Sequence, residues 1–175
     1  MESVISIIDR IIEEHKVILS EAKSLEVVTN DTFALEAIRQ GREAFMPGRF
    51  DPKEGLLKLE SLRAKLEQGL EKHFNMEETR LLEGIQRFAG DALLSTYETL
   101  LKEHREIRER MAELKGHVDE LLTEYLSRHV WESKAYDMRA HMTNIYSRIA
   151  VHASNEEKLL HQVRKDLLAK QEEKK

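Results

Sequence analysis

The sequence predicts an all-α protein, folded as an antiparallel up-down four-helix bundle with a short helical insertion between the first two helices. Helix breakers are few, because the 175 residues include only seven glycines and two prolines, whereas charged residues make up 35%. Apolar residues recur every three to four positions in four long segments, which is the stripe of an amphipathic helix. Most connections between these segments are short, as in antiparallel bundles.

The first predicted helix has a regular apolar stripe, and the insertion after it does not. Residues 2–28 carry a continuous apolar stripe, whereas residues 29–52 break it. Within this insertion we expect a short helix over 31–45 and a loop over 46–52, which holds both prolines. We interpret the insertion as a surface connector. The alternative is a lid or a partner-docking segment, because it offers three apolar anchors: Phe45, Met46 and Phe50.

The other three helices have clearer starts and stripes. Asp51 is suited to cap the second helix, with Pro52 at its first position and a leucine stripe beyond. A turn near 88–91 separates this helix from the third. The next turn, near 127–129, contains neither glycine nor proline and is only weakly marked. The fourth helix carries its apolar stripe over 138–163.

Length and composition limit the classes of protein. The chain fits one domain, assigned to residues 1–170, followed by a flexible tail over 171–175. The lack of cysteine excludes disulfide scaffolds, thiol catalysis and cysteine-ligated clusters. The net charge of -5 argues against a nucleic-acid binder. Because there is neither a membrane-spanning apolar run nor the basic start of a signal peptide, we expect a cytoplasmic protein with no membrane partner.

Each long helix carries one histidine inside its apolar stripe. A single core histidine is ordinarily a hydrogen-bonded packing residue, but four of them, one per helix, are harder to explain in this way. Buried imidazoles need polar partners, and a metal centre satisfies several of them together. The four histidines are His15, His73, His104 and His152.

Two of these histidines are followed by a glutamate four residues later: His73 by Glu77, and His152 by Glu156. Side chains at this spacing lie on one helical face, about 5–6 Å apart at Cβ. A buried carboxylate is costly unless it is paired, so a cation is its natural partner. Each half of the chain supplies one lone histidine and one such pair. This predicts two metal ions that take two imidazoles each and share both glutamates as bridges.

The heights of the histidines along the helices agree with a single ligand layer. His104 and His152 lie at equal distances in sequence from the third turn, and His73 and His104 lie at similar distances from the second. On antiparallel helices, equal numbers of residues from a turn mean equal heights. The insertion prevents the same comparison for His15.

The residue types leave the metal open. Mixed imidazole and carboxylate ligands suit iron, manganese, cobalt or zinc. Ferritin-like di-iron bundles place a glutamate three residues before a histidine. None of the histidines in this chain has that neighbour, so the ferritin-like family is not indicated.

The ordered set of motifs resembles the hemerythrin-like, HHE cation-binding domain over roughly residues 3–168. The resemblance implies a four-helix bundle around a non-haem di-iron centre, bridged by carboxylates and an oxo or hydroxo group, with manganese or zinc as alternative metals. It further implies terminal ligands at His15, His73, His104 and His152, and bridging ligands at Glu77 and Glu156. The motifs that carry it are lone His15, the run His73-Phe74-Asn75-Met76-Glu77-Glu78, the pair Glu103-His104, and His152-x-x-x-Glu156.

The sequence departs from the oxygen-carrying members of this family at two places. Carriers have a further histidine four residues before the position that matches His104, and here that residue is Leu100. Their last acidic ligand follows its histidine by five residues, whereas Glu156 follows His152 by four. The resemblance therefore points to the wider branch with one histidine fewer. That branch includes oxygen- and iron-sensing modules and proteins that handle nitric oxide or repair iron centres.

Three functions remain open from the sequence. The first is a protein that binds or senses O2, NO or iron itself and reports through a signalling partner. The second is an oxidoreductase or iron-centre repair protein that consumes peroxide or nitric oxide. It would need an electron-donor protein, because the chain has no cysteine to supply electrons. The third is a structural or interaction bundle that a metal stabilises.

Residues next to the predicted ligands are expected to have lesser roles. Glu78 and Glu157 adjoin the bridging positions, and we interpret them as solvated or as supports of the ligands. Glu103 is expected at the surface, Tyr97 in the core, and His129 in the third turn.

Overall fold

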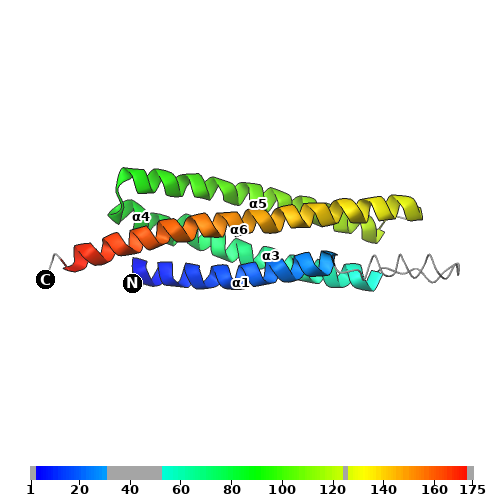
Figure 1. Cartoon of the computed structure of the whole chain (residues 1–175), viewed down its shortest axis with the longest axis horizontal. Coiled ribbons are helices and arrows are strands. Elements are labelled where there is room, and N and C mark those ends of the chain that lie inside the picture. Colours follow the sequence, from blue (N-terminus) through cyan, green and yellow to red (C-terminus); the bar gives the residue numbers. More distant parts are fainter. Residues whose placement is uncertain (1–2, 31–52, 124–125, 173–175) are drawn as a thin grey trace.

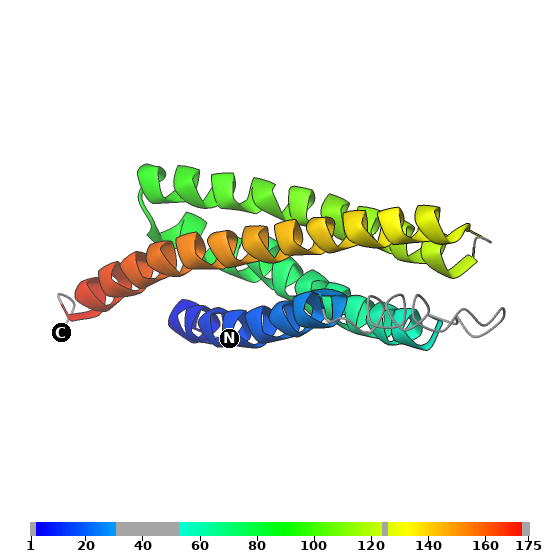
Figure 2. The same cartoon turned by 45° about the vertical axis from the view of Figure 1, so that its right-hand side comes forward.

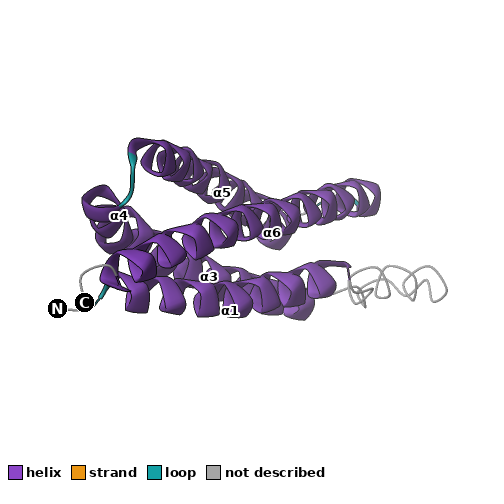
Figure 3. Cartoon of the chain, turned by 60° about the vertical axis from the view of Figure 1, so that its left-hand side comes forward, coloured by secondary structure: helices purple, strands orange, loops and turns teal. Residues whose placement is uncertain are grey.

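The computed structural model describes residues 3–30, 53–123 and 126–172, which are almost entirely helical. The helices are α1 (Val4–Asn30), α3 (Lys53–Met76), η1 (Glu77–Leu81), α4 (Leu82–Phe88), α5 (Asp91–Thr123) and α6 (Arg128–Glu172). Because α3, η1 and α4 follow one another without a loop, they form one interrupted rod. The described residues build four rods that run alternately up and down (Figure 1) and contain no strand (Figure 3), so the predicted all-α bundle is confirmed.

Each rod of the bundle packs on two neighbours. α1 contacts α3, α3 contacts α5, α5 contacts α6, and α6 closes the circle on α1. With 45 residues, α6 is longer than α1 or α5 (Figure 2). None of the described helices has the length and apolar character that crossing a membrane requires.

The helix boundaries differ from the predicted ones in a few places. α1 continues to Asn30, while the short helix and loop predicted within 31–52 lie outside the described residues, as does the Asp51–Pro52 cap. The turn after Phe88 is confirmed, because the chain becomes extended at Ala89. The expectation that His129 lies in a turn is wrong, because α6 already begins at the residue before it. α6 also runs two residues into the predicted tail.

The core is divided into two apolar clusters along the bundle. One contains Ile18 and Ile107 and reaches to Trp131, which is buried near the start of α6. The other contains Ile11 and Leu100. On every rod the predicted histidine lies between a member of one cluster and a member of the other. A polar layer therefore crosses the middle of an otherwise apolar core.

The second rod has a π-helical turn, η1, at the level of this layer. Here the N–H of Leu82 donates to the carbonyl oxygen of Glu77, five residues earlier. The same carbonyl accepts a hydrogen bond of 3.1 Å from the phenol of Tyr97 on α5. Such π turns insert one extra residue into a helix and are frequent at functional sites. The apolar stripe of this segment gave no indication of the turn.

Replacement of Gly116 by alanine should stabilise the protein by about 0.5–1 kcal/mol. Gly116 lies within α5, and an added Cβ would meet no atom within 4 Å. Alanine restricts the unfolded chain without creating a clash, so the melting temperature should rise by about 1–4 °C. Gly84→Ala is the matched control. There the added Cβ would lie 2.8 Å from Val4 Cγ2, so a comparable gain at Gly84 would contradict this interpretation.

Candidate metal centre

The six predicted ligands meet in the polar layer, and none of them is more than 3% exposed. α1 supplies His15, α3 supplies His73, and η1 begins with Glu77. α5 supplies His104, and α6 supplies both His152 and Glu156. The equal heights predicted for His104 and His152 are confirmed by a separation of 3.1 Å between their Nε2 atoms.

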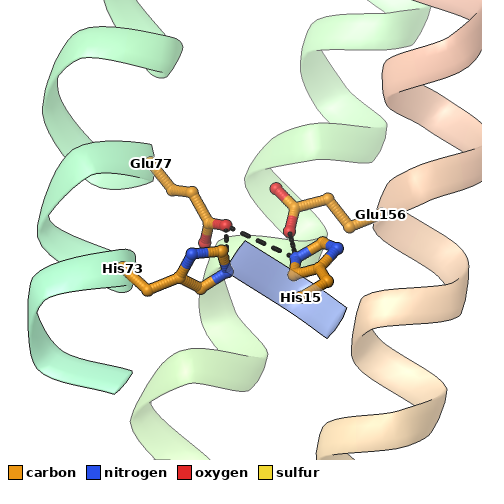
Figure 4. Close-up of side chains that lie close together, drawn as sticks. All are labelled: His15, His73, Glu77 and Glu156. Atoms are coloured by element: carbon orange, nitrogen blue, oxygen red, sulfur yellow. Dashed lines mark ion pairs between the residues drawn. The ribbon is translucent and has the colours of Figure 1, made fainter. Parts of the chain in front are cut away.

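The first of two overlapping groups of ligand atoms contains His15, His73, Glu77 and Glu156, within 4.8 Å of one another (Figure 4). His73 Nε2 lies 2.7 Å from Glu77 Oε1, and His15 Nε2 lies 3.2 Å from Glu156 Oε2. A longer separation of 3.8 Å joins His15 Nε2 to Glu77 Oε1. In Figure 4 the two glutamates approach from opposite sides, with His73 beside Glu77 and His15 beside Glu156.

The second group contains Glu77, His104 and His152, again within 4.8 Å of one another. The other carboxylate oxygen of Glu77, Oε2, lies 3.0 Å from His104 Nε2. Glu77 thus presents one oxygen to each group. Glu156 Oε2 lies 3.7 Å from His152 Nε2, so the second predicted bridge reaches toward this group less closely.

The donor atoms of this layer are arranged for a cation rather than for one another. All four carboxylate oxygens of Glu77 and Glu156 are buried, and none makes a well-directed hydrogen bond, nor does either ring nitrogen of His15. Buried polar atoms without such bonds are costly in a folded protein. Nitrogen and oxygen lone pairs that converge on a common point, at short separations but poor hydrogen-bond angles, fit ligation of metal ions.

Every histidine in the layer has its outward nitrogen, Nδ1, next to a glutamate from another helix. Glu103 was expected at the surface, and its side chain is 40% exposed, but its Oε2 also lies 2.8 Å from His152 Nδ1. Glu78 and Glu157 contact histidines as well, which agrees with their interpretation as supports. Glu14 was not singled out in the sequence. The available signal was its place directly before His15, which matches that of Glu103 before His104.

Without metal, the charges of the histidines and glutamates in the layer compensate one another. Burial opposes protonation of His15, but its contacts with Glu156 and Glu77 outweigh this and raise its pKa to about 10. Burial likewise opposes protonation of His73, yet Glu14 and Glu77 raise its pKa to about 9. Burial also opposes ionisation of Glu77, but contacts with His104, His15 and His73 hold its pKa well below the usual range.

Glu156 differs from Glu77 in its ionisation. Burial, and then repulsion from Glu77, raise the pKa of Glu156 to about 7. Two carboxylates in one buried layer resist carrying negative charge together. A bound cation would remove this conflict, because it favours the ionised form of both. The arrangement therefore fits a positively charged occupant.

The profile of the family described as Hemerythrin HHE cation binding domain matches residues 6–163, a range that contains all six residues of the layer. The chain belongs to this family. The same comparisons found no matching curated protein and no matching solved structure. Together with the buried histidine and glutamate groups, the family identifies this hemerythrin-like chain as a metal-binding protein.

Proposed function

We propose that the protein holds two iron ions in the polar layer and binds or senses a small ligand there, such as O2 or nitric oxide, or iron itself. The observation that carries this proposal is the pair of ligand groups that share Glu77. Two ions bridged by a carboxylate typically lie about 3.5–4 Å apart. Mixed imidazole and carboxylate ligands suit iron, with manganese or zinc as alternatives.

Within this proposal, His15, His73 and Glu156 would hold one ion, His104 and His152 would hold the other, and Glu77 would be available to both. When bound, the iron pair would supply open coordination positions and one-electron redox steps. The group at His104 and His152 has three ligand residues, against four in the other group. We therefore assign the small ligand to the His104 side.

The surrounding residues would orient this side and exclude water from it. The ring of Phe74 stacks on His104 at a centroid distance of 3.9 Å and so fixes the plane of the imidazole. Leu100 lies in the apolar cluster one turn before His104 and is 6% exposed. An apolar wall here favours a small uncharged ligand, because a charged one would lose its hydration without compensation.

An oxidoreductase or iron-centre repair protein acting on peroxide or nitric oxide is the second candidate. The smaller ligand group favours it, because a metal with fewer protein ligands has more positions for a substrate. The chain has no cysteine, so a separate protein would have to deliver electrons. A bundle that metal only stabilises is the third candidate.

Anaerobic purification, metal analysis and absorption spectra before and after exposure to air test this proposal. Two irons per chain with near-ultraviolet bands that grow on oxidation would support it. One tightly held zinc with no response to air would contradict it and favour the stabilised bundle. Catalytic turnover of peroxide or nitric oxide with an added electron donor would favour the oxidoreductase.

Leu100→His should slow the binding of a small uncharged ligand such as nitric oxide roughly tenfold or more, because changes around metal ligands act at this scale. The new imidazole would lie one turn before His104 and could occupy a position that is otherwise open to the small ligand. Stopped-flow mixing measures the rate of binding. Thr99→His, at the exposed neighbouring position, is the control. Equal binding rates in the wild type and Leu100→His would contradict the assignment of the open side.

A further inference from the structure

Four glutamates form a closed ring of contacts around the polar layer. Each one reaches from its own helix to the outward nitrogen of a histidine on the next helix, and one such link crosses each of the four interfaces of the bundle. The links are Glu14 to His73 at 3.0 Å, Glu78 to His104 at 2.9 Å, Glu103 to His152 at 2.8 Å, and Glu157 to His15 at 3.3 Å.

The ring follows from a local rule in the sequence. Each of the four glutamates is the immediate neighbour of a residue that points into the layer, for example Glu14 of His15 and Glu78 of Glu77. Successive residues on a helix are turned by about 100° from one another. When one side chain points into the core, its neighbour therefore points sideways toward the adjacent helix. The four glutamates accordingly remain 34–40% exposed.

Each hydrogen-bonded link determines which nitrogen of the neutral ring carries the proton. An ionised carboxylate only accepts hydrogen bonds, so the facing Nδ1 must carry a hydrogen. Nε2, which points into the layer, then keeps its lone pair for a metal. Carboxylates placed behind ligand histidines orient the ring and raise the basicity of the ligand nitrogen. Three links are directed hydrogen bonds, and the fourth, Glu157 to His15, is an ion pair.

We propose that this glutamate ring sets the affinity of the two metal ions separately, one half of the ring for each ion. Glu14 and Glu157 support the two histidines of the first group, so they govern the ion held there. Glu78 and Glu103 support His104 and His152, so they govern the other ion. This inference rests on the proposed two-metal centre and adds four positioning residues to it.

Titration of anaerobic wild type, Glu103→Ala and Glu14→Ala with Fe(II), and in parallel with Co(II), tests the proposal. Each variant should bind one ion about 10–100-fold more weakly and keep the affinity of the other within about twofold. The double variant Glu14→Ala with Glu103→Ala should bind both ions more weakly. Glu14→Ala combined with Glu157→Ala should instead act on the same ion and spare its partner.

Matched controls lie beside the chosen residues. Glu106 on α5 pairs with Arg148, and Glu13 on α1 pairs with Lys16 at 2.6 Å. Neither contacts a histidine of the layer in these pairs, so Glu106→Ala and Glu13→Ala should leave both affinities unchanged. The melting temperature of each variant without metal serves as the folding control. A positioning role predicts that each variant still unfolds in one cooperative transition without metal, because the ring glutamates are partly exposed.

A spectroscopic readout separates positioning from a general loss of structure. In the Co(II)-loaded wild type, proton NMR should give shifted, exchangeable signals from the Nδ1–H groups of the ligand histidines. Glu103→Ala should accelerate exchange of one such signal, the one that His152→Ala removes. Glu103→Gln should be intermediate, because its carbonyl oxygen still accepts the hydrogen bond but carries no charge.

Several outcomes would overturn the proposal. Unchanged affinity for both ions in Glu103→Ala and Glu14→Ala would show that the links do not affect the metals. If each single variant lost the same affinity for both ions, the division of the glutamate ring into two halves would be contradicted. If the wild type itself binds fewer than two ions, the proposed two-metal centre fails and the ring loses its role with it. That result is distinguishable, because it appears before any substitution is made.

Discussion

Replacement of Glu77 by glutamine is expected to lower the affinity for both metal ions, by at least roughly 100-fold each. Loss of a ligand should exceed the roughly 10–100-fold effect of losing a residue that supports a ligand from behind. Glu77 is the one residue that belongs to both ligand groups of the described chain. Its two oxygens face different histidines, His73 at 2.7 Å and His104 at 3.0 Å. Glutamine keeps the shape of the side chain but removes its charge and one oxygen acceptor.

Loss of one histidine should have a narrower effect than loss of Glu77. His152 belongs only to the second group, so His152→Ala should release one ion and retain the other. Metal analysis after anaerobic loading and desalting would separate the variants, with near zero ions expected for Glu77→Gln and near one for His152→Ala. Glu83→Gln, at an exposed position on α4, is the control. Two ions retained by Glu77→Gln would contradict the bridging role.

The fold and the inward-facing residues could be predicted because both depend on helical periodicity. An apolar stripe fixes which face of a helix is buried, and a histidine such as His15 within that stripe must point into the core. Spacing by four residues then brings Glu77 and Glu156 to the same face as His73 and His152. Packing of the four stripes against one another is sufficient to bring these residues together.

The outer contacts and the π turn could not be predicted by the same reasoning. The partner of Glu103 depends on which helix lies beside α5 and on its exact height, and neither is encoded in the stripe of α5 itself. Exposed glutamates are common on helices, so the positions of Glu14 and Glu103 directly before core histidines were only a weak signal. The π turn at Glu77–Leu81 is accompanied by a tertiary contact, the hydrogen bond from Tyr97, that the apolar stripe of this segment does not encode.

Removal of the two metals should lower the melting temperature by about 10–30 °C. At each site, a ligand present at 100 to 1,000 times its dissociation constant stabilises the folded state by about 2.7–4.1 kcal/mol. In a chain of this size each kcal/mol corresponds to about 2–4 °C. Without the metals, the carboxylates of Glu77 and Glu156 are buried together with no metal ion to offset their repulsion, which destabilises the folded protein. Thermal unfolding before and after treatment with a strong chelator gives the difference.

The difference in melting temperature between the metal-loaded and the metal-free protein should widen as the pH rises from about 6.5 to 10. In the chain alone, burial opposes protonation of His15 and His73, but neighbouring glutamates raise the pKa of His15 to about 10 and that of His73 to about 9, above the ordinary value of 6.5. A raised histidine pKa contributes stability that is complete below the unfolded value and is lost as the pH passes the folded value. Metal-free protein should therefore lose stability across this interval.

The loaded protein should not share this loss, because metal ligation requires neutral imidazoles and becomes more favourable as protons are removed. Glu156, whose pKa is raised to about 7 by burial and Glu77, adds to the same trend between pH 4.5 and 7 in the metal-free chain. Melting temperatures of both forms at pH 6.5, 8 and 9.5 would test this. A gap that stayed constant or narrowed with rising pH would mean that protons and metal ions do not compete for this layer, and the histidines would then not be the ligands.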